Sequence, residues 1–219
     1  MFCHSHPYPP YIPDQCTKLI VGTLPPPRFT TGELRQGDVN FCYGSRDGQL
    51  WPILDRLFDL NLVYENSARA IEQRKSFLRQ RGIGICDIVE RAYRQKVDAT
   101  DAGMQEVVLR NLIEILASHP SVDTLLFTGG NSKNGPEYFF RRMLRARNIG
   151  LRILNPEVPR IHAFDLPDSN RTIQTVSLTA PSGSANRAVG SMKAYKEMKS
   201  KDSSFTTLDF RCMQYRPYF

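Results

Sequence analysis

Short apolar runs alternate along the chain with polar segments that are rich in glycine and proline. Four of these runs are expected to be buried strands, because each is short and bounded by turn-forming or polar residues. The expected strands are 17–23 (TKLIVGT), 122–128 (VDTLLFT), 151–154 (LRIL) and 172–179 (TIQTVSLT). A further short segment, 82–90 (GIGICDIVE), is bounded by glycine, and its pattern does not assign it to a class.

Apolar residues at helical spacing predict helices between these strands. The apolar stripe from Leu50 to Phe58 is typical of a helix, and Ser67 is expected to cap a second helix. The expected helices are 50–58, 67–81, a segment from Thr100 and Asp101 to about 116, a segment that begins at Pro136, and 188–199. Strands that alternate with helices predict a parallel α/β sheet.

The remaining segments define the expected domain organisation. Residues 28–48 are expected to form a long polar loop, and 155–171 a proline-rich surface loop. The tail 210–219 (FRCMQYRPYF) is aromatic enough to pack back on the domain. We therefore expect an extended arm over 1–16 and one domain over 17–219.

The composition restricts the class of protein. With 219 residues, 41% of them hydrophobic, the chain can bury one sizeable core. No apolar run approaches the ~20 residues of a membrane-spanning helix, and the first residues do not resemble a signal peptide. We therefore expect a cytoplasmic protein, associated with the nucleoid in a prokaryote, and no membrane partner. Five scattered cysteines without a CxxC pair argue against a disulfide framework, a zinc ribbon or an iron–sulfur cluster.

The charge favours a polyanionic partner. Lys and Arg outnumber Asp and Glu by 29 to 22, which gives a net charge of +7 and a pI of about 9.3. Such a balance attracts polyanions and releases their counterions on binding. A solvated basic surface without a partner is the alternative interpretation.

Polar loops follow three of the expected strands, at 22–27 (GTLPPP), 128–132 (TGGNS) and 180–187 (APSGSANR). Ligands bind outside the carboxyl ends of parallel strands, so these loops predict one shared site. Taken singly, each loop is also compatible with an ordinary turn or helix cap. The loops lack the GK[ST] ending of a P-loop, and the chain has no GxSxG, HExxH or strand-linked GxGxxG motif. None of the four histidines lies in them.

Four segments together resemble the uracil-DNA glycosylase superfamily, over about residues 18–199. The first motif of that family is matched by 22–25 (GTLP), and its HPSPLS-type motif by 180–184 (APSGS). Residues 41–51 (FCYGSRDGQLW) resemble the YYGxPxNxFW segment of the mismatch-specific and hypoxanthine-type branches. Residues 82–89 (GIGICDIV) are similar to the GIGLxDVV segment of the same branches.

The resemblance implies a three-layer α/β/α domain with a central, mainly four-stranded parallel sheet. It further implies a monomeric DNA glycosylase of base-excision repair, which flips a deaminated or mismatched base such as uracil or hypoxanthine out of DNA. Hydrolysis of the N-glycosidic bond then needs a positioned water and donors to the leaving base, and no cofactor.

The resemblance also suggests the residues that carry the chemistry. The family often holds the attacking water with Asn or Asp at the position where this chain has Leu24. We therefore expect the role to fall to Asp47 in the 41–51 segment, with Asn40 in reserve. The alternative role for Asp47 is to cap the helix over 50–58.

Substrate binding is expected from Gly22, Thr23, Leu24 and Pro25 through the backbone of the first motif. Tyr43 and the adjoining Gly44 are expected at the flipped base, on which the Tyr43 ring would stack. Thr128 occupies the position where relatives read the base edge with Asn, and Asn131 is a possible substitute.

DNA contacts are expected from the loop over 180–187, in which Ala180 replaces the family histidine. Its serines would bind phosphates, and the residues after them would enter the groove. The expected DNA-binding residues are Pro181, Ser182, Gly183, Ser184, Asn186, Arg187 and Lys193. Two alternatives for the function stay open. One is a catalytically silent nucleic-acid-binding member of the family, and the other is an α/β enzyme or binding module for free nucleotides or other small phosphorylated ligands.

Overall fold

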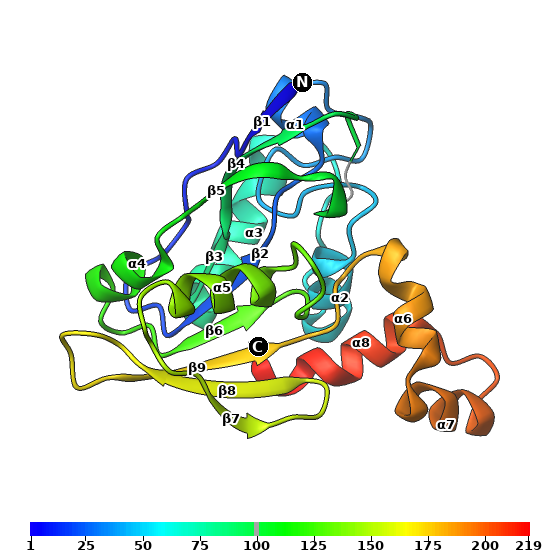
Figure 1. Ribbon diagram of the computed structural model, residues 1–219. Coiled ribbons are helices and arrows are strands. Elements are labelled where there is room, and N and C mark those ends of the chain that lie inside the picture. Colours follow the sequence, from blue (N-terminus) through cyan, green and yellow to red (C-terminus); the bar gives the residue numbers. More distant parts are fainter. Residues whose placement is uncertain (99–100) are drawn as a thin grey trace.

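A six-stranded sheet forms the centre of the computed structural model, which describes residues 1–98 and 101–219 (Figure 1). The order of its strands is β3 (Ile83–Asp87), β2 (Lys18–Gly22), β6 (Thr124–Phe127), β9 (Thr172–Ser177), β8 (Arg160–Asp165) and β7 (Arg152–Asn155). The first four run parallel to one another, whereas β8 and β7 are antiparallel to their neighbours. The sheet is therefore mixed.

All four expected strands overlap strands of this sheet, and β3 lies within the glycine-bounded segment 82–90. A surface loop was expected over 155–171. This prediction was wrong for the middle of the segment, which forms β8. Prolines on both sides suggested a loop, and the charged Arg160 and buried His162 obscured the strand pattern. The expected sheet of mainly four parallel strands therefore did not include β3 or β8, and its strand over 151–154, now β7, pairs antiparallel with β8.

Helices pack on both faces of the sheet, because successive side chains of a strand point to opposite sides. Leu19 and Val21 of β2 pack with α4 (Leu112–Ser118) and α5 (Pro136–Arg145). Ile20 between them packs with the other layer. That layer consists of α2 (Leu50–Phe58), α3 (Ala68–Arg81) and α8 (Thr207–Tyr215). The chain is thus an α/β protein with a helical layer on either side of its sheet.

A second, three-stranded antiparallel sheet contains β1 (Phe2–Ser5), β4 (Val89–Arg94) and β5 (Gln105–Leu109). The expected helix from 100 to about 116 was wrong in its first half, which forms a short 3-10 turn, η1 (Asp101–Gly103), and β5. Pairing with β4 overrides the helical spacing of the apolar residues there. Thr100, the other expected helix start, lies outside the described residues.

The N-terminal arm lies along the domain in regular structure. Its strand β1 pairs with β4, and the backbone of Tyr11 exchanges two hydrogen bonds with that of Ile85, at 3.0 and 2.8 Å. The arm therefore extends both sheets. The short helix α1 (Pro27–Thr31) follows β2, and it ends at Gly32 in the left-handed conformation.

The C-terminal segment packs back as its aromatic residues indicate, with Phe210, Tyr215 and Phe219 buried. The tail forms α8 and a final 3-10 turn, η3 (Arg216–Tyr218), and Figure 1 shows α8 beside α2 and α6. The single helix expected over 188–199 is divided at Met192, whose extended backbone separates α6 (Asn186–Ser191) from α7 (Lys193–Lys201). Within 1–98 and 101–219, none of the helices has the length and apolar character needed to cross a membrane.

Candidate functional site

The candidate site lies at the carboxyl edge of the parallel strands. β2, β6 and β9 pair in parallel register, so the loops at 22–27, 128–132 and 180–187 all leave this edge. β3 contributes its last residue, Asp87, directly opposite Gly22. The three loops singled out from the sequence therefore leave one side of the sheet, where ligand sites of such sheets form.

Gly22 permits a close approach of two polar side chains. A Cβ atom at this position would lie 2.0 Å from the Tyr43 hydroxyl and 2.4 Å from Asp87 Oδ1. Distances this short are impossible between non-bonded atoms, so Tyr43 and Asp87 occupy the space of the missing side chain. The resemblance placed Gly22 and Tyr43 in one site, and the structure brings the two into contact.

Tyr43 is held from both of its ends. Its hydroxyl lies 2.7 Å from Thr128 Oγ1, at the end of β6, and burial raises the pKa of this hydroxyl well above its usual value. Its backbone adopts a φ of 57° in a tight turn. In that turn the Val39 amide bonds to Gly44 O at 2.7 Å, and a Cβ on Gly44 would lie 1.8 Å from Val39 O. Gly44 is therefore a positioning residue for Tyr43.

The N-terminal arm adds a histidine that the sequence did not indicate. His6 Nε2 lies 2.8 Å from Asp87 Oδ2, and His6 Nδ1 lies 2.8 Å from Tyr8 O. The His6 side chain is 1% exposed and the Asp87 side chain 7%. The two residues are 81 positions apart and are joined by the pairing of the arm with the domain, so no local motif could reveal the pair.

A second carboxylate reaches the site from outside the main sheet. Thr23 Oγ1 donates to Asp101 Oδ2 at 3.4 Å, and Asp101 belongs to η1, between β4 and β5. Burial raises the pKa of the Asp101 carboxyl to about 6, although the Arg94 guanidinium and the Thr23 hydroxyl favour the ionised form. Arg94 is itself buried and donates through Nε to His4 Nδ1 at 2.8 Å.

Asp47 and Asn40 lie in exposed parts of the 28–48 segment. The Asp47 side chain is 64% exposed, and its Oδ2 lies 3.2 Å from Nη2 of Arg28. Asn40 Oδ1 accepts from the Tyr8 hydroxyl at 2.7 Å. The helix-cap alternative for Asp47 does not apply, because α2 is preceded by Gln49 and has no side-chain cap.

The 28–48 segment is organised around the buried Asp38. Arg28 donates to both of its oxygens, from Nε at 2.7 Å and from Nη2 at 2.8 Å. Burial alone would raise the pKa of Asp38, but hydrogen bonds from Arg28 and from the amides of Arg46 and Arg35 lower it to about 2. The Arg28–Asp38 ion pair therefore fixes the 28–48 segment, and with it the position of Arg28 beside Asp47.

The 180–187 loop is anchored by Arg211 of α8, which is fully buried. Its guanidinium donates to Ala180 O at 2.9 Å and to Ser182 O at 3.1 Å, and to the side-chain oxygens of Gln49 and Asn186 at 2.8 Å each. The loop also pairs with the 41–51 segment, where the Gln49 amide donates to Pro181 O at 2.8 Å. Two of the four segments that carry the family resemblance are thus in direct contact. Nothing local in the C-terminal tail distinguishes Arg211 as their link.

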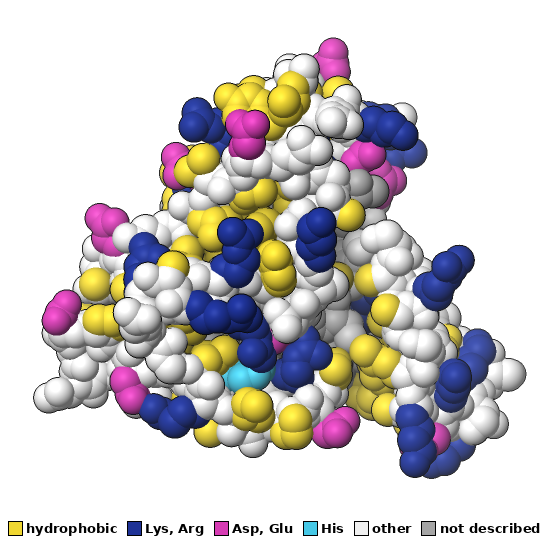
Figure 2. All heavy atoms as spheres, in the orientation of Figure 1, with side chains coloured by type: hydrophobic (Ala, Val, Ile, Leu, Met, Phe, Trp, Pro, Cys, Tyr) yellow, Lys and Arg dark blue, Asp and Glu magenta, His cyan; other side chains and the backbone are white. Residues whose placement is uncertain are grey.

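The expected DNA-binding residues differ in their exposure. Gly183, Ser184, Arg187 and Lys193 are exposed, whereas Pro181 is buried and the Asn186 side chain bonds to Arg211. Ser182 and Ser184 face each other, with their hydroxyl oxygens 3.0 Å apart. Figure 2 shows Lys and Arg side chains over α6 and α7, next to this loop, and a further group over α5. The exposed part of the loop therefore borders a basic surface.

The other loop residues have mixed environments. Leu24 is half-buried and packs against the core under α4 and α5, while Asn131 is exposed. Beside the 128–132 loop, the buried Glu137 accepts from Arg160 at 2.6 Å and from Arg141 at 2.8 Å. Arg160 Nη2 would lie 2.7 Å from a Cβ on Gly130, so this glycine makes room for the arginine.

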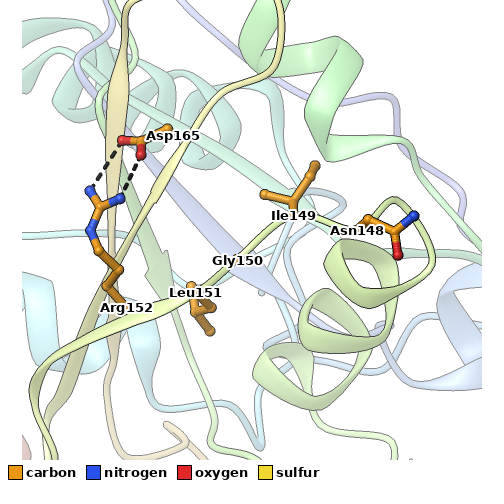
Figure 3. Close-up of a pocket in the computed structure, with 6 residues that line it drawn as sticks. All are labelled: Asn148, Ile149, Gly150, Leu151, Arg152 and Asp165. Carbon is orange, nitrogen blue, oxygen red and sulfur yellow. Dashed lines mark hydrogen bonds and ion pairs between the residues drawn. The ribbon is translucent and has the colours of Figure 1, made fainter.

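A pocket elsewhere on the surface does not belong to this site. The pocket in Figure 3 has a volume of about 400 Å³ and is lined by residues 148–152 and Asp165. Asp165 pairs with Thr172, the first residue of β9, which places the pocket at the opposite, amino-terminal edge of the parallel strands. Arg152 and Asp165 form an exposed bidentate ion pair there, at 2.5 and 3.1 Å.

Gly22→Ala tests the close approach at the site. The added methyl group must displace the Tyr43 hydroxyl and Asp87, because both lie within 2.4 Å of its position. We expect the free energy of unfolding to fall by about 1–3 kcal/mol, as for other overpacked sites. Urea denaturation measures the change. Gly183→Ala is the matched control, since no atom lies within 4 Å of its added Cβ, and equal stability of the two variants would contradict the packing.

Arg211→Met tests the anchor of the 180–187 loop. The substitution leaves Ala180 O and Ser182 O without their donor in a partly buried place, so we expect a loss of about 2–4 kcal/mol of unfolding free energy. We also expect weaker binding to a fluorescein-labelled duplex in an anisotropy titration. Arg187→Ala, an exposed neighbour, is expected to weaken DNA binding without a loss of stability. A fully stable Arg211→Met protein would contradict the anchoring role.

No protein-family model matches this chain, and no curated protein matches it in sequence.

Proposed function

We propose that the protein is a DNA glycosylase, which hydrolyses the N-glycosidic bond of a deaminated or mismatched base that has been flipped out of DNA. The observation that carries the proposal is the contact of Gly22, Tyr43 and Thr128 at the carboxyl edge of three parallel strands. These residues come from three different loops, and the resemblance assigned all of them to substrate binding. Their convergence supports a single nucleotide site.

The geometry suits an extruded nucleotide in several ways. Gly22 lets Tyr43 lie against the end of β2, and Tyr43 offers an aromatic ring on which a base can stack. The Thr128 hydroxyl, fixed by Tyr43, can bond to the edge of the base. One hydroxyl makes one such contact, so the site is expected to tolerate more than one kind of base.

The surroundings of the site suit the sugar–phosphate backbone. The 180–187 loop is fixed by Arg211 from below and presents Ser184 and Arg187 to solvent. Lysines of α7 continue the positive charge beyond the loop. Such contacts bind phosphates without reading the sequence, and they weaken as salt rises.

The chemistry needs a water and a group that orients it. Hydrolysis develops positive charge on the sugar and negative charge on the departing base, so a carboxylate beside the sugar assists it. Asp87 and Asp101 place carboxylates at this edge, and Asp47 places another in the adjoining 41–51 segment. No further component is required by this reaction.

Excision assays test the proposal. Labelled duplexes with uracil opposite guanine, hypoxanthine opposite thymine or thymine opposite guanine are incubated with the protein and cleaved with alkali at abasic sites. We expect excision from at least one duplex. Salt-sensitive binding without excision of any base would identify a silent binding protein, and affinity for mononucleotides without duplex binding would identify a small-ligand protein.

Thr128→Val separates base recognition from general packing. The change removes the hydroxyl that meets Tyr43 and keeps the volume of the side chain, so we expect excision to fall about 10-fold or more in kcat/KM. Thr175→Val is the matched control, because Thr175 is equally buried in β9 but lies within the strand, away from its carboxyl end. Equal loss in both variants would contradict the role of Thr128.

A further inference from the structure

Two segments converge on Asp101 and fix its position. Thr23, directly after β2, donates its hydroxyl to Asp101 Oδ2. Asn134, in the loop between β6 and α5, donates through Nδ2 to the carbonyl oxygens of Asp101 at 2.9 Å and of Met104 at 3.3 Å. Asn134 is buried, so these bonds are protected from water. The η1 turn is thereby tied to the carboxyl edge of the main sheet, although it belongs to the smaller one.

The two acidic side chains around the Gly22–Thr23 turn have different environments. Asp87 lies below Gly22 and is bonded to His6. Asp101 lies beside Thr23 and is half-buried. In the described part of the chain, Thr23 is the one residue that donates a hydrogen bond to the Asp101 carboxylate, and this bond goes to Oδ2 and uses no lone pair of Oδ1. A carboxylate that is held in place with one accepting oxygen suits general base catalysis.

We propose that Asp101 is the general base of the excision reaction and activates the water that attacks the sugar. This assignment rests on the proposed function. The family often has a polar side chain at the position of Leu24, which directly follows Thr23. Asp101 supplies a polar group at this turn from η1 instead. Asp47, the residue expected from the sequence, is instead 64% exposed and pairs with Arg28.

The step balances with water as the only co-reactant. Asp101 accepts a proton from the water as its oxygen forms a bond to C1′ of the sugar. The electron pair of the C1′–N bond leaves with the base. The protonated Asp101 then gives its proton to the departing base and is a carboxylate again. The products are the free base and DNA with a hydroxyl group at C1′.

The charged groups that face Asp101 define a pH dependence. Arg94 on β4 favours its ionised form, and Asp87 on β3 opposes it, while burial raises its pKa to about 6. A base must be ionised to accept a proton. We therefore expect the excision rate to rise about 10-fold per pH unit below pH 6 and to level off above it.

Asp101→Asn is the direct test, in single-turnover excision from the duplex that the wild-type protein cleaves best. We expect a loss of at least about 100-fold at pH 7.5, with DNA affinity within about threefold of wild type. Asp101→Glu is expected to recover part of the rate. Asp168→Asn is the matched control, an exposed carboxylate in the loop between β8 and β9, and it is expected to retain full activity.

The stability of Asp101→Asn shows whether its loss of activity comes from a damaged fold. An aspartate whose pKa is raised by folding lowers stability as the pH rises through about 4 to 6. Asp101→Asn removes this effect, so we expect a melting temperature at pH 7.5 equal to or above that of wild type. Loss of activity in a well-folded variant then supports the assignment.

Two results would overturn the assignment in distinguishable ways. Full activity of Asp101→Asn beside an active wild type, with or without a loss in Asp47→Asn, would remove Asp101 from the mechanism and leave the proposed function intact. Absence of excision by the wild-type protein from every duplex would contradict the proposed function and this assignment with it.

Discussion

The arrangement of the candidate site depends on the absence of a side chain at Gly22. The Tyr43 hydroxyl and Asp87 Oδ1 occupy the space in which a Cβ would lie, at 2.0 and 2.4 Å from it. Through Tyr43 this contact reaches Thr128 on β6, and through Asp87 it reaches His6 in the N-terminal arm. Two distant segments are therefore packed against one backbone position at the end of β2, and two more are bonded to them.

Most of the central sheet could be predicted from local patterns. The expected strands that correspond to β2, β6 and β9 are short apolar runs with polar loops after them. Such runs indicate strands that are buried between two helical layers. Strand β8 could not be predicted in this way, because it carries Arg160 and the buried His162, which bond to Glu137 and Arg141 of α5. The prediction of a helix that begins near residue 101 was wrong for a different reason. β5 is a strand because it pairs with β4, and this pairing cannot be predicted from the spacing of apolar residues within the segment.

The candidate site was predictable where it follows strand ends and was missed where it depends on long-range contacts. Gly22, Tyr43 and Thr128 were identified from motifs and from their place after strands, and the structure brings them together. His6, Asp101 and Arg211 were not identified. Each reaches the site from an arm, a hairpin or the C-terminal helix, and each acts through contacts between distant segments. The catalytic role expected for Asp47 was inferred from its position in the 41–51 segment. That position gives no information on burial, and the Asp47 side chain is 64% exposed.

The central claim is that this edge of the sheet receives an extruded nucleotide. A crystal structure with a duplex that carries a non-cleavable 2′-fluoro-2′-deoxyuridine tests it most directly. We expect a nucleotide turned out of the helix, with its base against Tyr43, its C1′ beside Thr23 and Asp101, and its flanking phosphates at the 180–187 loop. A nucleotide that stays stacked in the duplex, or DNA bound away from this edge, would contradict it.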